Sequence, residues 1–93
     1  MLPPLFIIAD IECDSLDGEG LICGLICGLD TDGRTIFRYV WTEETATDTL
    51  LQFKGQLDKL KPKHKIINML DEDSVDNYLL NKQFEKYLGQ NPL

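Results

Sequence analysis

The sequence has little of several features that would mark a special class of protein. Its 93 residues include only three cysteines, four prolines and one histidine, and this cysteine content is too low for a disulfide-rich secreted scaffold. It contains no apolar run long enough to span a bilayer, and its first residues lack the basic segment of a signal peptide. We therefore expect one globular domain over residues 1–93, located in the cytoplasm and without membrane contact.

Positive charge is also scarce. Nine Lys and Arg residues stand against sixteen Asp and Glu residues, which gives a net charge of −7. Non-specific electrostatic binding to nucleic acid is not expected of such a chain, unless metal ions or a local basic strip offset the charge. The one basic strip is the lysine cluster at positions 59, 61, 63 and 65. We interpret it as a solvated helix end and loop, since cations suit a helix C-terminus.

The cysteines favour reduced thiols over a metal site. Cys13, Cys23 and Cys27 are odd in number, and two of them lie in an apolar segment, as expected for free thiols in a cytosolic protein. Cys23 and Cys27 could begin a zinc site. No second Cys/His pair follows them, however, and His64 stands alone, so zinc is disfavoured.

An acidic pair closes the first strong strand signal. The apolar segment 5–9 predicts a buried strand that runs to about Cys13. Asp10 and Glu12 follow the apolar segment two residues apart, so their side chains project from the same face of the strand. Two neighbouring carboxylates repel each other, and a divalent cation with oxygen ligands would compensate. The plainer alternative is that both acids simply begin an exposed loop.

Two further strands and a hairpin follow. Residues 21–29 contain a duplicated LICG segment, too short for a structural repeat, and their two glycines favour a strand with a bulge or a closely packed neighbour. Asp30 to Gly33 is a hairpin turn. Residues 34–41 form the partner strand, in which the aromatic residues Phe37, Tyr39 and Trp41 alternate with Ile36, Arg38 and Val40. The aromatic side chains could stack on bases, but packing against a helix is the simpler interpretation.

Helical periodicity dominates the rest of the chain. Thr42 resembles an N-cap, and the helix after it ends at Pro62. Residues 65–70 form a short fourth strand, and residues 71–74 open a second helix that Gly89 ends. The predicted apolar stripe of the first helix is Ala46, Leu50, Phe53, Leu57 and Leu60, and that of the second is Val75, Tyr78, Leu79, Tyr87 and Leu88.

The resulting order is β-β-β-α-β-α, an α/β (α+β) fold with a mixed sheet. A right-handed crossover places the fourth strand beside the first strand and parallel to it. The acidic end of the first strand and the acidic start of the second helix would then share one edge of the sheet, where such folds usually bind ligands.

This order, with residues 6–13 reading FIIADIEC, resembles the N-terminal half of the ribonuclease H-like fold. The segment is similar to the first motif of the DEDD family of 3′→5′ exonucleases, and in particular to the proofreading domains of family B DNA polymerases. The resemblance implies that Asp10 and Glu12 bind two divalent metals, Mg²⁺ or Mn²⁺, for phosphodiester hydrolysis at the 3′ end of single-stranded nucleic acid.

The family's second motif has a partial match. Asn68 corresponds to the asparagine of the fourth strand, which shapes the site or touches substrate, and Asp76 to the helical aspartate that acts as a catalytic metal ligand. Asp73 is the rival ligand if the alignment has no gap. Alternatively, the acids of 71–76 only suit a helix start, Asn68 only bonds turn backbone, and His64 is a solvated loop residue rather than a general base. The third motif has no match in this sequence.

Two classes of function follow from the sequence. The first is a metal-dependent exonuclease-type module that is incomplete alone or depends on a partner. The second is a small acidic interaction or inhibitor protein, of the kind found in phages and mobile elements, that mimics nucleic acid or blocks an enzyme. Acids concentrated at one sheet edge favour the first class, and acids spread over the surface favour the second. A protein partner, or homodimerisation through a free strand edge, would supply what the fold lacks.

Overall fold

The computed structural model describes residues 1–13 and 21–93. Its sheet holds four strands in the order β3-β2-β1-β4. These are β1 (Pro4–Cys13), β2 (Leu21–Leu29), β3 (Thr35–Trp41) and β4 (Lys65–Asn68), with helix α1 (Ala46–Leu60) between β3 and β4 and helix α2 (Val75–Leu88) after β4. The predicted α+β class, the order of elements and the mixed sheet are confirmed.

The pairing of the strands follows the predicted crossover. β1 is antiparallel to β2 and β2 to β3, whereas β1 is parallel to β4. β4 is short: its ladder with β1 runs from Pro4 opposite Lys65 to Ile7 opposite Asn68, and the amide of Met69 adds one bond to the carbonyl of Ile7. Beyond Ile7, the outer edge of β1 therefore continues without a strand partner.

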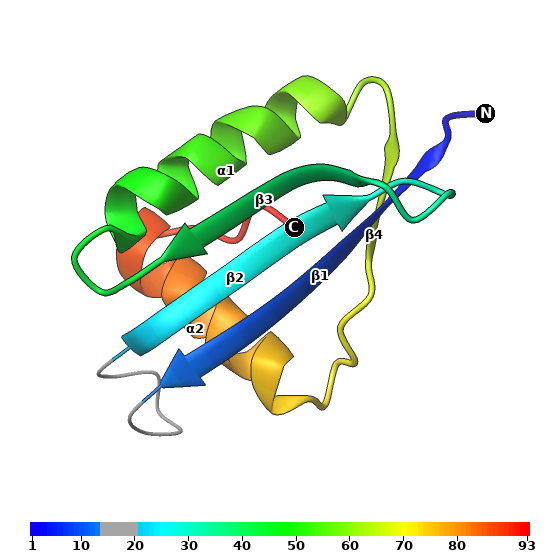
Figure 1. Cartoon of the computed structure of the whole chain (residues 1–93). Coiled ribbons are helices and arrows are strands. Elements are labelled where there is room, and N and C mark those ends of the chain that lie inside the picture. The colour runs from blue at the N-terminus through cyan, green and yellow to red at the C-terminus, as the bar shows by residue number, and fades with distance from the viewer. Residues whose placement is uncertain (14–20) are drawn as a thin grey trace.

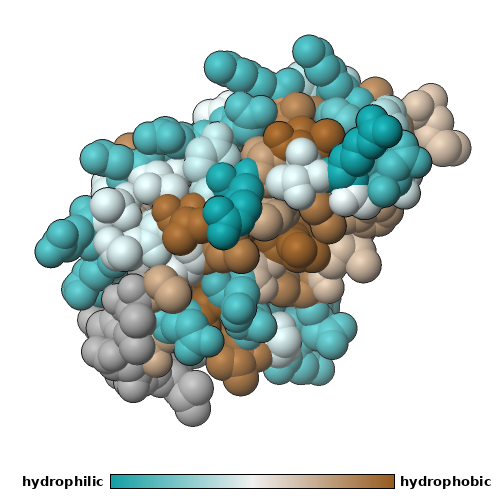
Figure 2. All heavy atoms as spheres, in the orientation of Figure 1, coloured by the Kyte–Doolittle hydropathy of each residue, from teal (hydrophilic) through white to brown (hydrophobic). Residues whose placement is uncertain are grey.

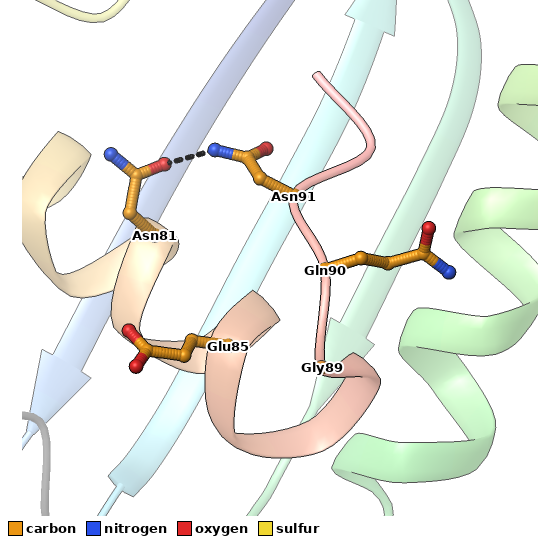
Figure 3. A pocket seen from close by; sticks show the side chains of 5 residues that line it. All are labelled: Asn81, Glu85, Gly89, Gln90 and Asn91. Carbon is orange, nitrogen blue, oxygen red and sulfur yellow. Dashed lines mark hydrogen bonds between the residues drawn. The ribbon is translucent and has the colours of Figure 1, made fainter.

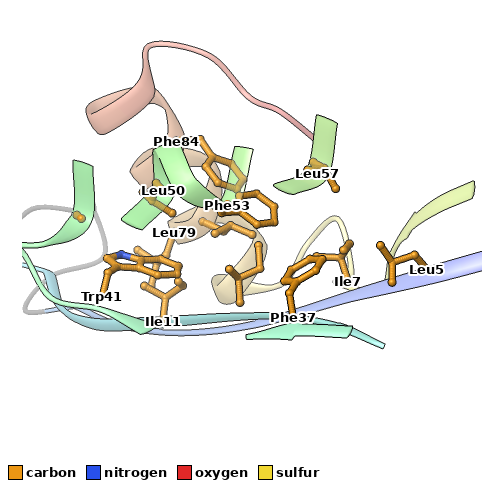
Figure 4. Close-up of a cluster of buried hydrophobic side chains, with 13 residues drawn as sticks. Leu5, Ile7, Ile11, Phe37, Trp41, Leu50, Phe53, Leu57, Leu79 and Phe84 are labelled. Carbon is orange, nitrogen blue, oxygen red and sulfur yellow. The ribbon is translucent and has the colours of Figure 1, made fainter. Parts of the chain in front are cut away.

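Both helices cover the same face of the sheet (Figure 1), where α1 contacts β3 and α2 contacts β1. The core lies in this layer (Figure 4), and its central ring is Phe53 of α1, which stacks on Phe84 of α2 at a centroid distance of 5.8 Å. Phe37 and Tyr39 of β3 reach the same ring at 5.7 and 6.3 Å. The aromatic side of β3 therefore packs on a helix, as the simpler interpretation held, and is not a surface for stacking bases.

Close packing explains the glycines of β2. A Cβ atom added at Gly24 would lie 2.3 Å from the ring of Trp41, and one added at Gly28 would lie 2.4 Å from the ring of Phe37. Both rings lean across β2 from β3, which they can do only where β2 carries no side chain on the helix-covered face. The expected bulge is also present, as a register shift between Gly28 and Leu29.

Two details of the helices differ from the sequence prediction. α1 has its N-cap at Thr45 rather than at Thr42, because residues 43–45 form a turn in which the amide of Thr42 donates to the Thr45 hydroxyl at 2.9 Å. α2 does not bury Val75 or Tyr78, which are 56% and 46% exposed. Since only one narrow side of α2 faces the sheet and α1, that helix instead buries the residues Leu79, Leu80, Gln83 and Phe84.

The remaining helix signals are confirmed. The stripe of α1 is buried at Ala46, Leu50, Phe53 and Leu57. α2 begins after Ser74, whose hydroxyl accepts from the amide of Asn77 at 3.1 Å, and ends at Gly89 in the left-handed conformation. The C-terminal segment then folds back, since the Lys61 ammonium donates to the carbonyl of Pro92 at 2.9 Å. None of the helices in the described part of the chain is long and apolar enough to cross a membrane.

Candidate functional site

The acid pair lies at the end of β1, on the face of the sheet that the helices leave uncovered. Side chains alternate along β1, and the odd-numbered residues Leu5, Ile7 and Ile11 are buried under the helices. Asp10 and Glu12 therefore project to the opposite face, and both are exposed. The predicted common orientation of the two carboxylates is present, but they are in contact with solvent rather than at the edge of the core.

Asp76 comes to the same point from a distant part of the chain. Its carboxylate Oδ1 accepts a hydrogen bond from the amide of Ile11 at 3.3 Å, the residue between Asp10 and Glu12. This is the edge of β1 that β4 no longer covers, so the carboxylate takes the place that a strand carbonyl would otherwise fill. Asp76 also lies in the first turn of α2, where the helix dipole favours an acid. The structure thus brings Asp76 and the acid pair to one segment of backbone.

The rival ligand does not reach this point. Asp73 is exposed and lines a shallow hollow with Glu72, Val75 and Tyr78 on the outer side of the turn before α2. Of the two candidates, Asp76 is the one that contacts β1, and the segment 71–74 is accommodated as a longer turn. Because that turn closes with the amide of Ser74 donating to the carbonyl of Asp71 at 3.0 Å, it also sets the start of α2.

Asn68 ends β4, and its side chain makes a local bond: Oδ1 accepts from the amide of Leu70 at 3.0 Å. It lies opposite Ile7, three residues before Asp10, and is exposed. The alternative in which Asn68 bonds turn backbone therefore describes its present contact. His64, in the turn before β4, is half-buried, and its Nδ1 is buried with no hydrogen-bond partner, so the expectation of a solvated loop histidine is wrong.

The described residues offer two solvent-facing carboxylates, Asp10 and Glu12, but no complete set of ligands for a metal ion. Over residues 1–13 and 21–93, no group of three or more His, Cys, Asp or Glu side chains is arranged to hold one. One carboxylate oxygen of Asp76 already accepts a hydrogen bond from the Ile11 amide, while Asp10 and Glu12 point into solvent. We therefore derive no catalytic step through a cation. Cys23 and Cys27 are free thiols, as predicted.

The lysine cluster lies far from the acids. All four lysines are exposed, at the end of α1 and the start of β4, and the amide of Lys65 bonds to the carbonyl of Pro3 at the beginning of β1. Six residues of strand separate Pro4 from Asp10, a distance of about 20 Å. A nucleic acid held by the lysines would have to run the length of β1 to reach the acid pair.

The exposed acids are widely distributed. Besides the pair on β1, they lie in the hairpin turn, before and within α1, in the turn before α2 and on α2, at Asp32, Glu43, Glu44, Asp48, Asp58, Asp71, Glu72, Asp73 and Glu85. The one marked pKa shift among them is at Asp58, whose pKa is lowered by its 2.8 Å hydrogen bond to the Lys54 ammonium. By the criterion set from the sequence, this spread favours the interaction protein.

A second polar hollow, of about 340 Å³, lies between α2 and the C-terminal segment (Figure 3). Asn81 and Asn91 face each other across it, with the Asn91 amide donating to the Asn81 side-chain oxygen at 2.9 Å. Glu85 and Gln90 extend outward from its rim. The hollow is a consequence of the return of the C-terminal segment and shares no residue with the acid pair.

The face of the sheet that the helices leave uncovered was not predicted from the sequence. Figure 2 shows hydrophobic side chains gathered over the strands on this face. The strand register places Ile8, Ile36 and Val40 on this face, with Met69 just after β4, and these four side chains are 40 to 55% exposed. The signal was present in β2, which has no polar side, and in β3, where Ile36 and Val40 alternate with the aromatic residues.

No protein-family model, no curated protein and no solved structure matches this chain.

Proposed function

We propose that this chain is a nucleic-acid-processing module of the 3′→5′ exonuclease type that is incomplete alone and acts with a partner. The observation that carries the proposal is the hydrogen bond from the Ile11 amide to Asp76. It joins the acid of the second motif to the backbone between Asp10 and Glu12, although 65 residues separate them in the chain. The contact brings a third acid to the acidic end of β1, although like charges repel.

A partner is needed to supply a further acidic ligand and a basic surface for the nucleic acid. The sequence has no match for the third acidic motif, and the acids in the described residues do not form a cation group. A partner that adds a carboxylate beside Asp10, and a basic surface that offsets the charge of −7, would supply both missing elements. The chain's own acids would then contribute oxygen ligands, of the kind that Mg²⁺ and Mn²⁺ prefer.

Metal titration is the first test. The melting temperature is measured with rising Mn²⁺ or Mg²⁺ for the wild type and for Asp10→Asn combined with Glu12→Gln. Metal at ten times its Kd stabilises the folded state by about 1.4 kcal/mol, or about 5–10 °C in a domain of this size. The double variant should lose this increase. Asp71→Asn with Glu72→Gln is the matched control, since it removes the same charge from an exposed turn and should keep the increase.

Digestion of 5′-labelled single-stranded DNA is the second test, with Mn²⁺ present and with the chain alone. The proposal expects metal binding without shortening of the DNA. An unchanged melting temperature at millimolar metal would refute the metal-binding part. Progressive shortening from the 3′ end, lost in the Asp10/Glu12 variant, would refute the partner dependence and establish an enzyme.

The distribution of exposed acids supports a second candidate, a non-enzymatic acidic interaction protein. Exposed carboxylates on β1, α1, α2 and the connecting turns resemble a dispersed negative surface more than a focused site. The metal titration separates the two: an interaction protein of this kind gains the same small, salt-like stabilisation in the Asp10/Glu12 variant as in the wild type.

A further inference from the structure

We infer that the uncovered face of the sheet is the interface of a homodimer, in which two copies pack sheet on sheet. The open face is defined by the side chains that point away from the helices on β1 (Phe6, Ile8, Asp10, Glu12), β2 (Cys23, Leu25, Cys27, Leu29), β3 (Ile36, Arg38, Val40) and β4 (Lys65, Ile67), with Met69 beside it. This inference does not depend on the proposed function.

The open face has the composition of an interface rather than of a solvent-facing sheet. Antiparallel sheets with one solvated side usually alternate apolar and polar residues, yet β2 presents only Cys and Leu in its described part. Ile8 pairs with Cys27, and Asp10 pairs with Leu25, which pairs in turn with Val40. Apolar side chains therefore fill two adjacent positions in each of these rows, which a charged residue ends at Arg38 or at Asp10. Contiguous exposed apolar surface of this kind marks a contact site.

A hollow at one end of the open face adds to this. Phe6, Ile8, Leu29 and Met69 line it, together with residues of the β2–β3 turn, in a volume of about 340 Å³. Ile8 and Met69 at its rim are 41% and 55% exposed. A flat solvated sheet has no such apolar recess, whereas the interdigitated face of a two-sheet sandwich does.

The charges on the open face identify a second copy as the occupant. The face carries its acids, Asp10 and Glu12, on β1, and its bases, Arg38 on β3 and Lys65 at the start of β4. A two-fold axis that runs along β2, between two stacked sheets, lays β3 of each copy over β1 of the other. Arg38 shares its row with Cys27 and Ile8, two residues from Asp10, which is about 7 Å along the strand. An arginine side chain spans that distance.

The arrangement is self-complementary, because the same operation places the Arg38 side chain of each copy near Asp10 of the other. A nucleic acid would meet as many acids as bases on the described part of this face, so the face has no excess positive charge with which to bind phosphates. An unrelated protein would need a base opposite Asp10 and an acid opposite Arg38. A second copy presents both, because the two-fold axis turns its β3 over β1. The face offers roughly 500 Å² per copy, from four strands about 4.8 Å apart, against about 800 Å² in a standard interface. We therefore expect a weak dimer.

Sedimentation equilibrium from roughly 1 to 500 µM tests the interface, since weak dimers dissociate in this range. The wild type should pass from monomer to dimer. Val40→Lys should raise the dissociation constant at least tenfold, because it places an ammonium in the apolar rows. Leu51→Lys is its matched control, being 52% exposed on α1 and away from the face, and should dimerise as the wild type does. Val40 is itself 48% exposed, so the substitution leaves the fold intact.

A charge reversal tests the choice of occupant. Arg38→Glu should weaken the dimer at least tenfold, while Arg34→Glu, an equal charge change at an exposed residue before β3, should weaken it by less than threefold. Adding Asp10→Lys to Arg38→Glu should restore dimerisation. A monomer at every concentration, a dimer that ignores Val40→Lys, as one formed through the β3 edge would, or a charge reversal without recovery would each overturn the inference.

Discussion

Replacing Gly24 by Ala tests the close approach of Trp41 to β2, which holds β3 onto the core. The new Cβ would lie 2.3 Å from Cζ2 and 2.4 Å from Cε2 of the Trp41 ring. Trp41 is 1% exposed, so the ring has no open space to move into. Alanine in a strand would otherwise gain stability over glycine, because glycine loses more conformational freedom on folding. We expect a net loss of about 1–3 kcal/mol from overpacking.

The measurement is thermal and urea denaturation followed by far-UV circular dichroism. Because Trp41 is the single tryptophan, a fluorescence signal would be lost in the variants that replace it. A loss of about 2 kcal/mol lowers the melting temperature by roughly 8–16 °C in a domain of this length. Gly55→Ala is the matched control. Gly55 lies within α1 and a Cβ there meets nothing within 4 Å, so that variant should gain about 0.5–1 kcal/mol from helix propensity.

Combining Gly24→Ala with Trp41→Leu separates the clash from other causes. The smaller side chain leaves room for the methyl group, so the two substitutions together should cost clearly less than the sum of their separate costs. The reasoning is refuted if Gly24→Ala is as stable as the wild type, or if its cost adds unchanged to that of Trp41→Leu.

Two further predictions concern the helices. Phe53→Ala removes the ring on which Phe37, Tyr39 and Phe84 converge and should lower the free energy of unfolding by about 3–5 kcal/mol. Leu51→Ala, at a nearby exposed position, should lower it by under about 0.5 kcal/mol. Melts followed by near-UV circular dichroism measure both, and similar losses in the two variants would contradict the assigned core. Ser74→Ala removes the hydroxyl that accepts from the amide of Asn77 and should cost about 1 kcal/mol, measured by urea denaturation, with Thr47→Ala inside α1 as a control that leaves stability within about 0.5 kcal/mol.

Most secondary-structure elements could be predicted from the local residue pattern of the chain. The strand of residues 5–13, the hairpin turn at Gly33, the stripe of α1 and the cap at Gly89 could all be predicted, because each depends on neighbours within one turn or one pleat. The parallel position of β4 beside β1 also followed, from the handedness of crossovers. The N-cap at Thr45 could not be predicted. Thr42 and Thr45 have equivalent side chains, and only the turn between them decides which one caps the helix.

The acid pair shows the same division. Sequence spacing placed Asp10 and Glu12 on one face of a strand, because side chains alternate there whatever surrounds them. Which face that is depends on the side from which the helices pack, and tertiary structure turned both carboxylates toward solvent. Whether Asp73 or Asp76 meets them was likewise open in the sequence, since the length of a turn does not fix its path.

The sequence by itself determined that this chain makes a mixed α+β sheet with two acids at the end of its first strand. Hydrophobic periodicity and turn-forming residues act over a few neighbouring positions, so the amino-acid sequence shows them directly. Tertiary structure alone decided that Asp76 bonds to the unpaired edge of β1 at Ile11, that glycines 24 and 28 make room for Trp41 and Phe37, and that one apolar face of the sheet stays uncovered. Each of these depends on contacts between distant segments, which form only when the helices settle on one side of the sheet.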